Sequence, residues 1–198
     1  MNSTSPKVGT ALKVGMYVLS LWLLFVLIIV NKVDIPICFK CDFAEGDVLL
    51  GIVKVNILPI ICITLLLISV VFYFWFKYLL AGSAIGPYRL VNVESKGSEH
   101  LVFLATYVIP LVGFSLENTR QMINLGITLG IIGVIYVKTN LFYANPTLSL
   151  LGFRVYEADI GSARVILIST DDLDEGDDVN YVVLDRKTFF AKKGLRMP

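Results

Sequence analysis

The sequence predicts a membrane-embedded, all-α four-helix transmembrane bundle that carries a small cytoplasmic antiparallel β element. Hydrophobic residues make up 56% of the 198 residues and charged residues only 17%, whereas a soluble domain carries about 25% charged residues. The apolar residues gather in four long runs, and strand-like alternation of apolar and polar residues occurs between and after these runs. This composition excludes both an ordinary soluble domain and a disordered chain.

Four apolar runs are the predicted membrane spans, and they assign residues 1–137 to a transmembrane region. The runs at 14–30 and 57–76 contain no charged residue, and a span needs about 20 apolar residues to cross the hydrocarbon. The runs at 101–116 and 122–137 have 16 residues each, so they cross only if flanking side chains reach the headgroups. A re-entrant hairpin formed by these last two runs is the alternative. No signal-peptidase site follows the first run, which we therefore expect to remain as an anchor.

The distribution of basic residues predicts the orientation. If all four runs cross, thirteen Lys and Arg residues lie on the side of the two termini and four lie on the opposite side. Basic residues are enriched in cytoplasmic loops. We therefore expect the N- and C-termini in the cytoplasm.

A cytoplasmic β-rich element is predicted from residues 138–198 together with the loop 87–100. The predicted strands are at 88–94, 153–157, 163–170 and 179–185, with a further one at 187–191. Roughly 60 residues are marginal as an independent domain, so we expect an oligomer or a partner. Between the last span and the strands, residues 141–153 are too short to cross; they predict an interfacial helix that begins near Asn145 and Pro146, or a hinge.

Cys38 and Cys41 form a CxxC pair in the outward loop. We interpret them as a possible structural disulfide, with a thiol oxidoreductase as the alternative. A zinc site is not expected, because the remaining candidate ligands, Cys62 and His100, lie in a span and across the membrane.

Six carboxylates gather in residues 171–178. They are interpreted either as a solvated hairpin loop or as a docking surface for a basic cytoplasmic partner; the spacing does not fit an EF-hand, since Leu173 would occupy a ligand position. The residues are Asp171, Asp172, Asp174, Glu175, Asp177 and Asp178.

Gly126, Gly130 and Gly133 form a small-residue stripe on the fourth run. Such stripes let membrane helices approach closely, although glycine is common in membrane helices in any case. We interpret the stripe either as a helix-packing surface or as this background.

No motif of an enzyme is found: the sequence contains no P-loop, GxSxG, HExxH or dinucleotide fingerprint. We therefore expect no catalytic residue, no metal and no cofactor. The spans contain no Asp, Glu, Arg or His, which disfavours an ion-coupled transporter. A net charge of +1 gives no indication of direct nucleic-acid binding.

Residues 136–158 read YVKTNLFYANPTLSLLGFRVYEA, and residues 103–133 read FLATYVIPLVGFSLENTRQMINLGITLGIIG. These segments and the four runs resemble the KwaA family, the small membrane subunits of the bacterial Kiwa anti-phage system. The resemblance implies an oligomeric inner-membrane sensor of infection that works with a soluble DNA-binding effector subunit, KwaB. The CxxC has no counterpart that we can place in the family. The alternative function is a pore-forming or channel-like protein.

Overall fold

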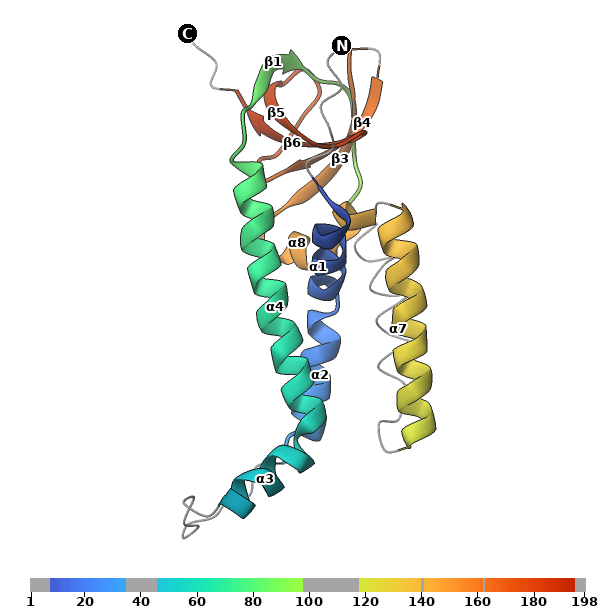
Figure 1. Cartoon of the computed structure of the whole chain (residues 1–198). Coiled ribbons are helices and arrows are strands. Elements are labelled where there is room, and N and C mark those ends of the chain that lie inside the picture. Colours follow the sequence, from blue (N-terminus) through green and yellow to red (C-terminus); the bar gives the residue numbers. More distant parts are fainter. Residues whose placement is uncertain (1–7, 35–45, 98–117, 140, 162, 195–198) are drawn as a thin grey trace.

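The structure, a computed structural model, describes residues 8–34, 46–97, 118–139, 141–161 and 163–194. Helices form one end of the molecule and a curled sheet forms the other (Figure 1). The long helices are α1 (Thr10–Ser20), α2 (Trp22–Lys32), α3 (Gly46–Val55), α4 (Ile57–Leu80) and α7 (Thr119–Thr139). Two short elements, η2 (Leu141–Ala144) and α8 (Pro146–Leu150), connect α7 to the sheet.

The predicted all-α four-helix bundle is wrong. The structure is a mixed helix and sheet fold, and within the described residues only α4 and α7 are single helices long and apolar enough to cross a membrane. The first predicted span is broken at Leu21 into α1 and α2, which are bent by 48° relative to each other and together make a third candidate span. The predicted span at 101–116 lies outside the described residues.

The sheet has six strands in the spatial order β1-β5-β6-β4-β3-β2. The prediction of a purely antiparallel element is also wrong, because β4 and β6 are parallel neighbours; the other pairs are antiparallel. The strands are β1 (Ile85–Arg89), β2 (Val91–Ser95), β3 (Arg154–Ile160), β4 (Ala163–Ser169), β5 (Asp178–Asp185) and β6 (Thr188–Lys193). The four strands predicted in the C-terminal region are confirmed as β3 to β6, with shifted ends.

The segment predicted as one strand at 88–94 is instead divided between two strands on opposite edges of the sheet. Leu90 alone separates β1 from β2, so the two edges must come close together and the sheet must curl. Leu90 is fully buried. Its N–H donates to the carbonyl of Asp177 (2.9 Å), and its carbonyl accepts from the N–H of Gly176 (3.0 Å).

The two faces of the curled sheet bury different cores. One face is lined by residues that contact only other parts of the sheet and its loops: Leu90, Tyr156, Ala158, Val165, Leu167, Leu173, Val179 and Ala191. The opposite face packs against the helices through Ile168, Val182, Leu184 and Phe190. Because side chains alternate between the faces of a strand, the central strands β4, β5 and β6 each contribute to both cores. The helices are therefore attached directly to the sheet.

Candidate functional site

The candidate site is the place where the helices meet the sheet, which we call the junction. Three helical segments and two strands supply its residues, and the elements are far apart in the sequence. The junction consists of Lys13 on α1, Phe76 on α4, Asn145 and Thr147 at α8, Phe153 before β3, Asp185 on β5 and Phe190 on β6.

An ion pair joins α1 to the end of β5. The Lys13 Nζ lies 3.0 Å from the Asp185 Oδ2, and the two side chains are only 13% and 10% exposed. Two residues before α1 begins, the N–H of Val8 donates to the carbonyl of Leu184 (3.1 Å). The start of α1 is therefore joined to the sheet by a side chain of its first turn and by the backbone just before it.

A second set of polar contacts holds the break between α1 and α2. The Asn145 Oδ1 accepts from the N–H of Thr147 (2.9 Å) and so caps α8, as its position before Pro146 predicts. The Asn145 Nδ2 donates to the carbonyl of Met16 (2.8 Å), and the Thr147 Oγ1 donates to the carbonyl of Leu19 (2.8 Å). The predicted helix near Asn145 is thus confirmed, and its side chains bond the backbone of the bent helix.

These contacts give a physical reason for the bend. Sharp helix kinks usually occur at Pro or Gly, or where a side chain inserts into the backbone ladder; Leu21 and its neighbours are neither Pro nor Gly. A break in an apolar helix leaves backbone carbonyls without their usual partners, which is costly away from water. The side chains of Asn145 and Thr147 donate to carbonyls near the end of α1, and the hydroxyl of Ser20, next to the break, donates to the carbonyl of Tyr17 (2.6 Å).

Three aromatic rings continue the junction from α4 to the sheet. The rings of Phe76 and Phe153 are 6.1 Å apart at 61°, and those of Phe153 and Phe190 are 6.4 Å apart at 60°. Edge-to-face packing of this kind is a favoured arrangement of buried rings. The C-terminal end of α4 and the helix-facing side of the sheet therefore share one core.

Of the predicted small-residue stripe, only Gly133 lies against another described helix. A Cβ added at Gly133 would lie 2.8 Å from the Tyr17 Cε1, whereas a Cβ at Gly126 or Gly130 meets no atom within 4 Å. The Tyr17 hydroxyl donates to the carbonyl of Leu129 (2.7 Å). Helix α1 also approaches α4 closely. An added Cβ at Gly15 of α1 would overlap the ring of Phe72 on α4.

The acidic segment 171–178 comprises most of the loop between β4 and β5 and the first residue of β5, and half of its carboxylates are bonded to the sheet. Asp172 pairs with Arg154. The Asp177 Oδ2 lies 2.9 Å from the Lys193 Nζ, and the Asp171 Oδ2 accepts from the N–H of Lys193 (3.0 Å). These bonds hold the loop against the sheet.

Asp174, Glu175 and Asp178 are exposed, and their carboxylates make no ion pair with any described residue. Asp174 and Glu175 line a groove of about 580 Å³ whose wall includes Arg154 and Tyr156. Of the predicted docking surface, these three carboxylates are therefore the ones available to a partner.

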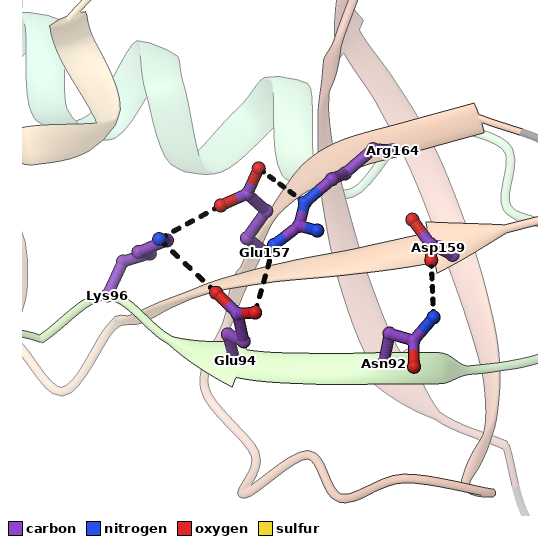
Figure 2. A network of polar contacts seen from close by, with 6 residues as sticks. All are labelled: Asn92, Glu94, Lys96, Glu157, Asp159 and Arg164. Carbon is purple, nitrogen blue, oxygen red and sulfur yellow. Dashed lines mark hydrogen bonds and ion pairs between the residues drawn. The ribbon is translucent and has the colours of Figure 1, made fainter.

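A network of four charges lies on the outer side of β2, β3 and β4 (Figure 2). Glu157 contacts Lys96 (3.0 Å) and Arg164 (2.7 Å), and Glu94 contacts the same two cations at 3.5 and 3.1 Å. The hydrogen bonds from Lys96 and then Arg164 lower the pKa of Glu157. The network holds β2 on β3 where the pairing of these strands is irregular.

Several predicted residues lie elsewhere. Cys38 and Cys41 are outside the described residues, and Cys62 is buried on α4. No group of three or more potential metal ligands occurs in the part of the chain that the structure describes. The sequence reasoning missed Lys13, Thr147 and Asp185 as site residues. The Asn145-Pro146-Thr147 capping pattern was a signal for Thr147, but nothing local marks the pairing of Lys13 with Asp185.

Comparison with known proteins identifies the family. A family model described as "Anti-phage protein KwaA" matches residues 12–190, which include the whole junction. The chain belongs to the KwaA family. A curated relative, the Kiwa protein KwaA of Escherichia coli O55:H7 (strain RM12579 / EPEC), is 39% identical over 187 residues, which cover 91% of this chain and 95% of the relative. The resemblance stated from the sequence is confirmed, and this KwaA-family chain is an anti-phage defence protein. No solved structure matches it.

Proposed function

We propose that this KwaA-family protein is the membrane-embedded sensor and scaffold subunit of an anti-phage defence complex. In this proposal it detects a membrane event in the bacterial inner membrane and relays it to a soluble, DNA-binding effector of the KwaB type. The family, the two candidate spans and the sheet bonded directly to the helices support the proposal. In this proposal the protein itself is not an enzyme and does not bind nucleic acid directly; the effector is the subunit that binds DNA.

The observation that carries the proposal is the junction. Lys13 and Asp185 join α1 to β5, while Asn145 and Thr147 join the broken helix to the segment that enters β3. Packed protein interiors move between discrete arrangements rather than deforming continuously. A displacement of α1 relative to α2 would therefore change the position of β5 and β3, and this is the movement that we propose the effector detects.

The same arrangement supports the proposed orientation. The described chain begins at Val8, which is bonded to Leu184, and ends at Gly194, whose N–H donates to the carbonyl of Asp178 (2.8 Å). Both ends thus lie at the sheet. With an even number of crossings, both termini and the sheet share the cytoplasm with the effector.

The proposed docking residues are Asp174, Glu175 and Asp178. Proteins that bind DNA carry basic surfaces, and a carboxylate surface is complementary to such a partner. Charge pairs of this kind raise the rate and the specificity of association. The neighbouring groove, with Arg154 and Tyr156 in its wall, offers space for a side chain of the partner.

The test is purification of the tagged protein in a mild detergent from cells that also express the effector of the same operon. We expect a homo-oligomer that retains the effector, and native mass determination gives the stoichiometry. The variant Asp174→Asn/Glu175→Gln/Asp178→Asn should release the effector and lose phage protection, since it removes charge without touching the bonded carboxylates. Asp34→Asn, an exposed acid near the opposite ends of the helices, is the control and should behave as wild type.

Two results would contradict the proposal. Retention of the effector by the triple variant at wild-type level would show that the acidic loop is not the docking surface. A homo-oligomer that binds no second protein and releases ions from liposomes when reconstituted alone would favour the pore instead.

A further inference from the structure

The short helix α8 and the turn after it expose two leucines, while the polar residues at the start of the helix are buried; Leu148 is buried and Ser149 is exposed. The polar side chains of Asn145 and Thr147 are 0% and 8% exposed, while Leu150 and Leu151 are 71% and 45% exposed. In water the opposite distribution is favoured, because buried polar groups require partners and exposed apolar area is costly. The same distribution is favourable where the surroundings are hydrocarbon.

The position of this turn relative to α4 points to the edge of a bilayer. Phe153, two residues after Leu151, packs on Phe76 near the C-terminal end of α4, and Figure 1 shows α8 at the level of this half of α4, on the helix side of the sheet. Here α4 exposes the aromatic side chains of Phe74, Trp75 and Tyr78, and Lys77 lies 5.9 Å from the ring centre of Tyr73. Aromatic residues and a basic residue at a span end are typical of the headgroup level.

A second copy of the chain is a less suitable occupant of this surface than lipid. A stable protein interface buries about 800 Å² per partner, whereas α8 offers two leucine side chains next to the sheet. On α4, the side chains of Val70, Val71 and Phe74 are exposed as well. Exposed apolar side chains along a candidate span are the ones that lipid covers.

We propose that Leu150 and Leu151 insert into the cytoplasmic leaflet, at the boundary between the phospholipid headgroups and acyl chains. This inference rests on the proposed membrane location. Asn145 and Thr147 belong to the same short segment and bond the carbonyls of Met16 and Leu19. Changes in lipid packing around the leucines therefore act directly on the α1–α2 break, which makes α8 the bilayer-contacting part of the junction.

The test uses the full chain reconstituted in liposomes of phosphatidylethanolamine and phosphatidylglycerol. An environment-sensitive fluorophore is attached to Leu150→Cys, or separately to Leu151→Cys, in a background of Cys38→Ser, Cys41→Ser and Cys62→Ala. Ala163→Cys is the control, since Ala163 is exposed at the end of the β3–β4 pair opposite to Arg154. We expect blue-shifted emission at both leucine positions, with several-fold stronger quenching by acyl-chain spin-labelled lipid than by iodide, and the reverse at position 163.

A second measurement avoids replacing the cysteines. A photoreactive diazirine amino acid at position 150 of the otherwise unchanged chain should give a phospholipid adduct, detected by mass spectrometry. Equal quenching by iodide at Leu150→Cys and at Ala163→Cys would overturn the inference. It would also be overturned if neither iodide nor spin-labelled lipid quenched the fluorophore at position 150 and the diazirine at that position crosslinked to protein. Failure of the wild-type chain to float with the liposomes would instead overturn the proposed membrane location.

Discussion

Lys13 on α1 and Asp185 on β5 form an ion pair across 172 positions of the sequence. The pair connects the first turn of α1 to the last residue of β5, and both side chains are largely shielded from water. The Asp185 Oδ1 also accepts from the N–H of Arg186 (2.8 Å), which fixes the carboxylate. The pair therefore determines how α1 approaches the sheet.

Asp185→Asn should destabilise the protein strongly. The substitution takes from Lys13 its ion pair with β5, and breaking a buried pair costs about 3–5 kcal/mol; for this largely but not fully buried pair we expect the lower part of that range. Thermal unfolding in detergent measures the effect, and the double variant Lys13→Met/Asp185→Asn should recover part of the lost stability. Asp174→Asn, at an exposed carboxylate that makes no ion pair with any described residue, is the control and should have little effect. Equal unfolding temperatures for Asp185→Asn and wild type would show that the pair is not a structural contact.

Thr147→Val should weaken the attachment of α8 to the α1–α2 break. The substitution keeps the shape of the side chain but removes the donor to the carbonyl of Leu19, and a buried acceptor without a partner costs about 1–3 kcal/mol. Thr128→Val is the matched control, because the Thr128 hydroxyl bonds only within its own exposed helix turn. Thermal unfolding and phage protection are compared for the two variants. If they lose stability equally, the hydroxyl of Thr147 has no special role at the break.

The sequence predicted those elements whose signal is local. Alternation of side chains located β3 to β6, and Asn145 before Pro146 located α8, because strand periodicity and helix capping depend on neighbouring residues. The break at Leu21 was not predictable, since it lies inside a continuous apolar run and depends on donors from α8. The division of 88–94 at Leu90 depends on backbone bonds to Gly176 and Asp177, which no local pattern reveals. The number of straight spans was overestimated for a related reason. An apolar run shows that its residues avoid water, but it does not show whether the helix stays straight.

Acidic pH should loosen β2 from the sheet. Hydrogen bonds from Lys96 and Arg164 lower the pKa of Glu157 below its ordinary value of 4.5, so the folded state binds this proton less readily than the unfolded chain does. The resulting stability is present above pH 4.5 and is lost as the pH falls through the lowered pKa. Thermal unfolding as a function of pH should show this loss in wild type.

Two variants test the assignment to Glu157. Glu157→Gln should lower the unfolding temperature at neutral pH by a few degrees and should reduce the acid dependence, since the amide does not titrate. Glu175→Gln, at an exposed carboxylate without an ion pair to any described residue, should keep the acid dependence of wild type. An unchanged acid profile in Glu157→Gln would assign the loss to other carboxylates.

Gly133 should be the sensitive position of the glycine stripe. Because an added Cβ would lie 2.8 Å from the Tyr17 Cε1, Gly133→Ala must displace α7 from α1 or move the Tyr17 ring away from its hydrogen bond to Leu129. Overpacking of this kind costs about 1–3 kcal/mol. Gly126→Ala and Gly130→Ala meet open space in the described structure and replace glycine by a better helix former, so they should unfold at or above the wild-type temperature.

Alanine and leucine variants at the three glycines also separate packing within one chain from packing between copies. We expect Gly133→Ala to lower the unfolding temperature of the chain. If Gly126→Leu leaves that temperature unchanged but reduces the native mass in detergent, then α7 packs against α1 at Gly133 and against a second copy at Gly126. Equal destabilisation by Gly126→Ala and Gly133→Ala would contradict the contact with Tyr17 as the reason for the sensitivity of Gly133. Full native mass in Gly126→Leu and Gly130→Leu would place the proposed oligomer contact on another helix, and the exposed apolar face of α4 would be tested next.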